Sequence, residues 1–85
     1  MHYVYVLFSN KDKKLYTGST SNLVERIKRH KRGLIRATKY RRPLKLIYYE
    51  ACLSRKDSMR REIYLKSAWG KKYLKNRLKD TVKII

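Results

Sequence analysis

The stretch KLYTGSTSNLVERIKRH, residues 14–30, combines the signals of a strand, a turn and a helix. Residues 14–18 predict a short strand that ends at a glycine. Asn22 is a favourable helix N-cap, and Glu25 follows three residues later, as in a capping box. The inward-facing positions of the helix recur at helical spacing in Leu23, Ile27, His30 and Leu34. Gly33 follows a run of cations suited to a helix C-terminus and is placed to end the helix.

The segment before this stretch predicts its partner strand. Residues 3–9 (YVYVLFS) are rich in aromatic and β-branched side chains, which favour strands. Both faces of that strand are apolar, which indicates a central strand covered on each side. Asn10 and Asp12 supply turn chemistry, so we expect the first two strands to form an antiparallel hairpin.

The second half of the chain predicts a strand and two helices. Residues 44–50 form the third strand, whose place in the sheet the sequence leaves open. Ser54 and Asp57 form a second capping box for a helix over residues 54–69, which Gly70 ends or bends. The apolar positions of this helix include Met59, Ile63 and Trp69. A third, strongly basic helical segment follows.

The expected element order is therefore β-β-α-β-α-α. Such an order predicts an α+β fold with a small three-stranded antiparallel sheet flanked by helices. No repeat or linker divides the chain. We expect residues 1–79 to form one domain and residues 80–85 to form a C-terminal tail.

Charge is the strongest compositional signal, because 24 Lys and Arg residues stand against 6 acidic ones and the formal net charge is +18. Self-repulsion of this size opposes folding, and a polyanionic partner would offset it. Nucleic acid is therefore favoured over a ribosome-type structural role or an anionic membrane surface. A single cysteine allows no intrachain disulfide, and no apolar run approaches 18 residues, so we expect a cytoplasmic location and no membrane partner.

Five residues form the strongest candidate site: Tyr5, Tyr16, Arg26, His30 and Glu62. The two tyrosines lie on strands that should pair, and the four-residue spacing of Arg26 and His30 places both on one side of a helix. Each residue also has an ordinary explanation. A strand tyrosine usually packs, a helix arginine is usually solvated, and Glu62 could pair with Lys66 at the favourable i, i+4 spacing. No glycine-rich phosphate loop or Cys/His zinc spacing competes with this site.

Taken together, these residues resemble the GIY-YIG motif. Tyr3-Val4-Tyr5 is followed by ten residues and then by Tyr16-Thr17-Gly18, with the helix and a later Glu in the same order. The resemblance covers roughly residues 3–78 and is to the short, single-domain members, relatives of the excision-repair nuclease domain. Tyr3 replaces the leading glycine, and Ser19 stands where the repair enzymes carry Lys.

The resemblance implies a DNA endonuclease that hydrolyses phosphodiesters with one divalent ion, Mg²⁺ or Mn²⁺. Glu62 would be the metal ligand, because Mg²⁺ needs few carboxylates and keeps several waters. Arg26 would hold the scissile phosphate. Tyr16 would orient or deprotonate the attacking water with help from Tyr5, and His30 would support the phosphate or the water. Only about 0.1% of a free tyrosine is ionised at pH 7, so a nearby cation would have to lower its pKa.

Further residues are candidates for binding nucleic acid: Gly18, Lys28, Arg29, Lys31, Arg32, Arg36, Lys39, Tyr40, Arg41, Arg42 and Asn76. Contacts of this kind give affinity without sequence choice, so we expect selection by DNA shape, with RNA as a second possibility. Tyr40 could stack on an unpaired base. Two alternatives stay open beside the endonuclease: a weakly active or inactive basic binding module on the same fold, and a ribosome-associated protein. A monomer is assumed.

Overall fold

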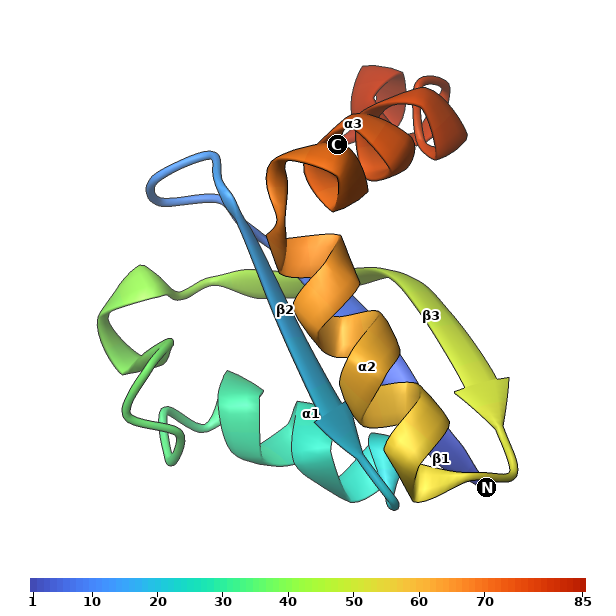
Figure 1. The fold of residues 1–85 in the computed structure, drawn as a ribbon. Coiled ribbons are helices and arrows are strands. Elements are labelled where there is room, and N and C mark those ends of the chain that lie inside the picture. Colours follow the sequence, from blue (N-terminus) through green and yellow to red (C-terminus); the bar gives the residue numbers. More distant parts are fainter.

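The computed structural model describes residues 1–85 and confirms the predicted α+β fold and element order (Figure 1). One antiparallel sheet contains β1 (His2–Ser9), β2 (Leu15–Thr20) and β3 (Leu44–Cys52). Its helices are α1 (Leu23–Lys31), α2 (Arg55–Lys66) and α3 (Ala68–Arg77). Short 3₁₀ helices cover Lys39–Arg41 and Thr81–Ile84. None of these helices has both the length and the apolar content needed to cross a membrane.

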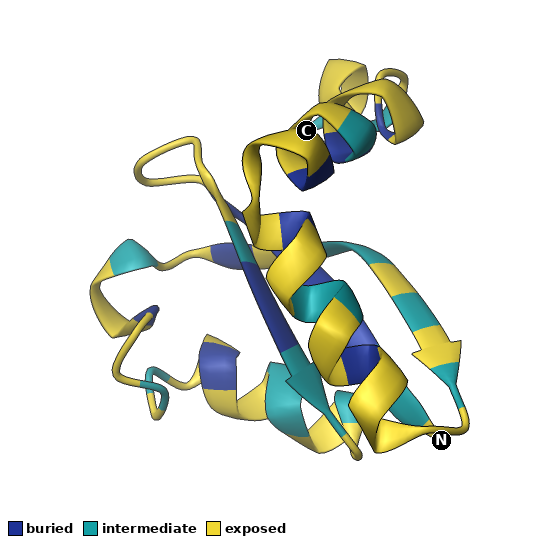
Figure 2. Cartoon of the chain, viewed as in Figure 1, coloured by how far each residue is buried: buried dark blue, intermediate teal, exposed yellow.

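β1 is the central strand, as its two apolar faces predicted, because the strand order is β2-β1-β3. Val4 and Val6 face α2 and α3 and form one core cluster with Leu65, Leu74 and Leu78. Tyr5 and Leu7 point to the opposite face, where α1 packs. The sheet therefore separates two layers of helices, with the buried residues concentrated along β1 and on the inner sides of the helices (Figures 1 and 2).

The predicted helix starts are confirmed. The Asn22 side chain accepts a hydrogen bond from the backbone N–H of Glu25 at 3.2 Å. Ser54 does the same for Asp57 at 3.2 Å. Gly33 follows the end of α1 with a φ of +77°, a left-handed conformation that favours glycine. Since the chain turns there, Leu34 lies outside the helix and is exposed, so its predicted place in the apolar stripe is wrong.

The predicted end of the second helix at Gly70 is also wrong. The helical run breaks earlier, at Ser67, which is the C-cap of α2 and the N-cap of α3. The Ser67 hydroxyl oxygen accepts a hydrogen bond from the Gly70 N–H at 3.2 Å. Gly70 therefore lies in the first turn of α3, where a serine cap rather than a glycine stop decides the boundary.

The three apolar residues that the sequence singled out in the second helix do not face the core. Met59 is 46% exposed, and Ile63 and Trp69 are each 71% exposed. Instead, α2 buries Ser58 and Leu65 against the sheet. Polar side chains on this inner side make hydrogen bonds to the sheet, and that bonding compensates for their burial.

Replacing Gly70 by Ala is expected to destabilise the fold. A Cβ at this position would overlap the backbone oxygen of Tyr64 and the backbone of Leu65, where α3 packs closely on the end of α2. Such overpacking costs about 2 kcal/mol or more, whereas helix propensity alone predicts a gain of about 1 kcal/mol. Urea unfolding of the variant measures the sign. An increase in stability would show that this close approach does not restrain the fold.

Candidate active site

Tyr5 is the centre of a polar network on the α1 face of the sheet, in which Tyr5, His30 and Thr38 are buried and Arg26 is half-buried. Its hydroxyl oxygen lies 2.7 Å from Nε2 of His30, and Nε of Arg26 donates to the same oxygen at 3.4 Å. The other ring nitrogen of His30, Nδ1, lies 2.7 Å from the hydroxyl of Thr38. Tyr16 completes the group, with its ring centroid 5.3 Å from that of His30. Four of the five predicted residues are therefore neighbours in space.

The chemistry of Arg26 fixes one direction in this network. A guanidinium nitrogen can only donate, so the Tyr5 oxygen accepts from Arg26. The two ring nitrogens of the neutral His30 imidazole have opposite roles, one donating and one accepting, and they lie against the hydroxyls of Tyr5 and Thr38. Thr38 thereby helps to fix the orientation of the His30 ring. The sequence contains no local signal for this role, because Thr38 belongs to a loop eight residues further on.

Burial keeps both partners of this hydrogen bond uncharged. It raises the pKa of Tyr5, and the hydrogen bond from Arg26 only partly opposes that effect. Burial, reinforced by the charge of Arg26, lowers the pKa of His30 to about 4. Tyr5 is therefore a phenol at neutral pH, and the lowered pKa that a tyrosine base would require is not met at this residue. In this arrangement Tyr5 positions Arg26 and His30.

Gly18 lies opposite Tyr5 in the β1–β2 register. A Cβ on Gly18 would come within 2.5 Å of the Tyr5 hydroxyl oxygen, a distance that real Cβ atoms do not adopt. The absence of a side chain at this position therefore makes room for the Tyr5 ring. Gly18 thus allows the Tyr5 ring to pack on β2 and to hold its place in the network.

Glu62 reaches the site from α2, on the other face of the sheet. The Ser19 hydroxyl donates to its Oε1 at 2.6 Å, and Lys66 donates to its Oε2 at 2.8 Å. Burial alone would raise the pKa of Glu62, but the hydrogen bonds from Lys66 and Ser19 and the charge of Arg26 outweigh it and lower the pKa. The i, i+4 pair with Lys66 is thus present, and Glu62 is a carboxylate at neutral pH.

Arg26 and Glu62 meet at one cavity although they come from opposite faces. β2 is an edge strand, and its C-terminal end lies between α1 and α2 (Figure 1). At that end, a cavity of about 490 Å³ is lined by both residues. The rest of the lining is mostly polar: His2, Ser19, Thr20, Ser21, Arg55, Ser58 and Met59. Tyr5 and Tyr16 do not line this cavity, and Tyr5 contacts it through Arg26.

Nine of the eleven predicted nucleic-acid contacts are exposed, and they fall into two groups, whereas Gly18 is buried and Arg41 is half-buried. Most lie exposed on α1 and the loop after it: Lys28, Arg29, Lys31, Arg32, Arg36, Lys39, Tyr40 and Arg42. Tyr40 is 73% exposed, and Lys39 lies over its ring at 5.1 Å. Asn76 is exposed on α3, on the opposite face of the sheet from α1, and it does not line the cavity.

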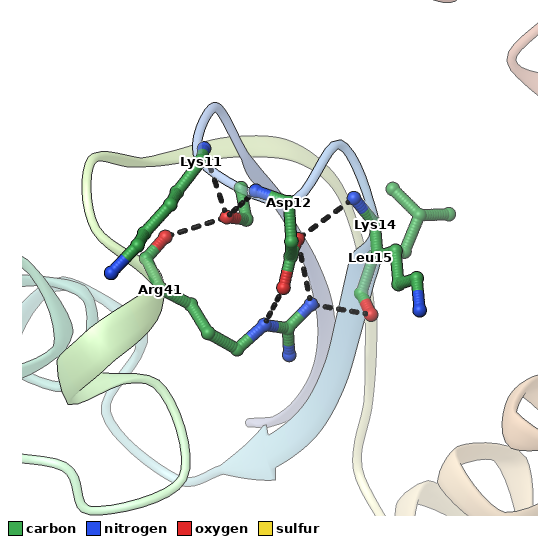
Figure 3. A network of polar contacts seen from close by, with 6 residues as sticks. Lys11, Asp12, Lys14, Leu15 and Arg41 are labelled. Atoms are coloured by element: carbon green, nitrogen blue, oxygen red, sulfur yellow. Dashed lines mark hydrogen bonds and ion pairs between the residues drawn. The ribbon is translucent and has the colours of Figure 1, made fainter.

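Arg41 has a structural contact that the sequence did not indicate (Figure 3). Its Nε donates to Asp12 at 2.6 Å, and its Nη2 donates to the backbone oxygen of Leu15 at 3.3 Å. The hydrogen bond from Arg41 lowers the pKa of Asp12 to about 2. The Ser9 hydroxyl donates to the Arg41 backbone oxygen at 2.6 Å. These contacts tie the basic loop to the β1–β2 turn.

The oxygen-rich part of the cavity is chemically suited to a hard divalent ion. Glu62 supplies an ionised carboxylate that the Ser19 hydroxyl contacts, and Thr20 and Ser21 line the same cavity. No group of three or more His, Cys, Asp or Glu side chains is placed to form an all-protein metal site. One carboxylate with open space fits the way Mg²⁺ binds, since that ion keeps several waters.

Acid is expected to destabilise the protein through His30. The unfolded chain takes up the imidazole proton near pH 6.5, whereas the folded state resists it until about pH 4. The unfolded state therefore binds more protons between these values, and the free energy of unfolding should fall by about 1 kcal/mol between pH 7 and pH 5.5. Urea unfolding across this range measures it. His30→Gln should flatten the profile, and an equal slope in the variant would contradict this assignment.

Comparison with known proteins identifies the class of this fold and site. The family model of the GIY-YIG catalytic domain matches residues 1–79, so the chain belongs to the GIY-YIG family, a family of nuclease domains. The resemblance that the motif indicated is thereby confirmed. No solved structure matches the chain significantly.

Within that family, the similar proteins are small ones named UPF0213. The chain is 45% identical over 67 residues to UPF0213 protein CPE1444 of Clostridium perfringens, which covers 78% of this chain and 71% of that protein. It is also 45% identical over 67 residues to UPF0213 protein SH2523 of Staphylococcus haemolyticus, covering 78% and 80%. UPF0213 protein YazA of Bacillus subtilis is 38% identical over 72 residues, covering 84% and 72%.

Proposed function

We propose that this protein is a metal-dependent endonuclease that hydrolyses phosphodiester bonds in DNA. The observation that carries the proposal is the shared cavity, where a guanidinium from α1 and an ionised carboxylate from α2 face the same space. A phosphodiester requires a cation for its oxygens, and a metal ion requires a carboxylate. The cavity supplies both groups at the edge of one strand.

Arg26 is the phosphate-binding residue in this proposal. One of its N–H groups is held by Tyr5, which leaves the other guanidinium donors for phosphate oxygens. A planar guanidinium matches two phosphate oxygens and stabilises the charge that grows on them in the transition state. Tyr5 and His30 keep the side chain in place, and Tyr16, beside His30, is proposed to orient or deprotonate the attacking water.

Glu62 is the metal-binding residue in this proposal, together with the hydroxyls of Ser19, Thr20 and Ser21. When bound, Mg²⁺ or Mn²⁺ supplies Lewis-acid polarisation of phosphate oxygens. Lys66 pairs with one carboxylate oxygen of Glu62, but the Lys66 side chain is 52% exposed and is free to move into solvent. The Glu62 carboxylate is thus held ionised, and movement of the Lys66 side chain into solvent would leave its Oε2 free to hold the metal ion.

The proposed substrate is DNA chosen by shape rather than by sequence, as in repair or recombination in the cytoplasm, with the protein acting as a monomer. The exposed cations on α1 and its following loop form a surface for phosphates. Sequence specificity requires contacts to base edges, and we identify no strand or helix dedicated to such contacts.

Incubation with branched, flapped and single-stranded DNA tests the proposal, with Mg²⁺, with Mn²⁺ and with a chelator. RNA is tested in parallel. Cutting that needs the metal supports the proposal, and a clear preference among the DNA forms supports selection by shape. If no substrate is cut although all are bound, the endonuclease proposal is wrong.

The ion pair at Glu62 supports a second candidate, a binding module on the same fold with weak or no activity. Both carboxylate oxygens already have protein donors, and the Tyr5 hydroxyl is buried. In that case the cavity would hold a phosphate group without cutting. Binding of DNA that is unaffected by Mg²⁺, together with no cutting, is the result that selects this candidate.

A further inference from the structure

The cavity beside β2 contains more positive charge than a single phosphate requires. Two arginines line it, Arg26 from α1 and Arg55 from the first turn of α2. Neither guanidinium forms an ion pair, although four ion pairs are present elsewhere in the protein. The only carboxylate in the lining, Glu62, is already paired with Lys66. Two unpaired cations in one concave space indicate a ligand with more than one negative group.

Arg55 lies at a distance from Glu62, the proposed metal-binding residue on the same helix. Arg55 precedes Glu62 by seven residues on α2, which is two helical turns and about 10 Å along the helix axis. Both side chains nevertheless reach the same cavity, since two turns return to the same side of a helix. His2, at the start of β1, and Ser58 line the cavity as well and add polar groups to it.

We infer that Arg55 forms a second phosphate-binding position, which holds the phosphate next to the one bound at Arg26. This inference rests on the proposed function, because it assumes that the cavity receives a nucleic-acid strand. It defines the substrate further: the strand continues past the bond at Arg26 by at least one phosphorylated nucleotide on the side of Arg55. A strand that ends in an unphosphorylated nucleotide on that side leaves Arg55 without its partner.

Short ligands test the inference best, because the protein cannot shift its position along them as it could along a long strand. The probes are a thymidine dinucleotide with its bridging phosphate alone, and the same dinucleotide with an added 5′ or 3′ phosphate. Their dissociation constants are measured by NMR titration of the wild type, of Arg55→Gln and of Lys56→Gln. Lys56 is the matched control, because it is the next residue, is exposed, carries the same charge and does not line the cavity.

One of the two added phosphates is expected to tighten binding to the wild type about fivefold, a typical coupling for one partly exposed charged contact. Arg55→Gln should remove this gain, Arg55→Lys should keep part of it, and Lys56→Gln should keep most of it. The inference is overturned if neither added phosphate helps the wild type, or if the gain persists in Arg55→Gln. Absence of DNA cutting would refute the endonuclease proposal alone, because these titrations measure binding without cleavage.

Discussion

Glu62→Gln is expected to reduce DNA cleavage by about 10³-fold while leaving DNA affinity unchanged or slightly higher. The substitution keeps the size of the side chain and removes the only carboxylate that lines the cavity. A neutral amide binds a hard divalent ion poorly, so the metal-dependent step should fail. The charge of Lys66 loses its partner at the same time, which adds a cation near the substrate and favours binding.

Single-turnover cleavage at saturating enzyme, combined with a binding titration in chelator, separates the two effects. Glu25→Gln is the matched control, because Glu25 is an exposed carboxylate on α1 that does not line the cavity. This control should cut like the wild type. If Glu62→Gln also cuts at the wild-type rate, Glu62 does not hold the metal.

Arg26→Lys is expected to reduce cleavage by about 10²- to 10³-fold, although it conserves the charge. Lysine cannot donate to Tyr5 while presenting a planar pair of donors to a phosphate, so the transition state loses its bidentate protein donor. DNA affinity should change little, since many exposed cations remain. The expected signature is a fall in kcat with a small change in KM.

Arg60→Gln is the control for Arg26→Lys, because Arg60 pairs with Asp57 on the exposed side of α2 and lies outside the cavity. Its removal should leave kcat unchanged. Thermal unfolding of both variants shows whether the fold is intact. Wild-type kcat in a folded Arg26→Lys protein would exclude Arg26 as the phosphate-binding residue.

Features that depend on near neighbours were predictable from the sequence. The caps at Asn22 and Ser54 and the pair Glu62–Lys66 involve residues three or four positions apart, and the hairpin of β1 and β2 joins two strands that follow each other directly in the chain. Hydrogen bonds and steric contacts between residues this close in the chain can be predicted from the local pattern of residues. The inward direction of His30 also followed from helical spacing, because His30 lies beside the apolar stripe of an amphipathic helix, which contains Leu23 and Ile27.

Apolar composition alone did not show which side of α2 faces the sheet. Met59 and Ile63 on α2 and Trp69 on α3 are exposed, whereas α2 buries Ser58 and Leu65. Glu62 contacts Ser19, a distant residue that no helical periodicity reveals. Similarly, Gly70 looked like a helix stop, whereas the fold uses it for close packing of α3 on α2.

By itself, the sequence determined the elements, their order, the family motif and the candidate residues for the proposed chemistry. Only the tertiary structure decided how those residues combine. Arg26 and Glu62 lie on opposite faces of the sheet and share a cavity only because β2 is an edge strand with a helix on each side. Such an arrangement depends on strand order and on helix packing over long separations, and neither leaves a periodic signal in the chain.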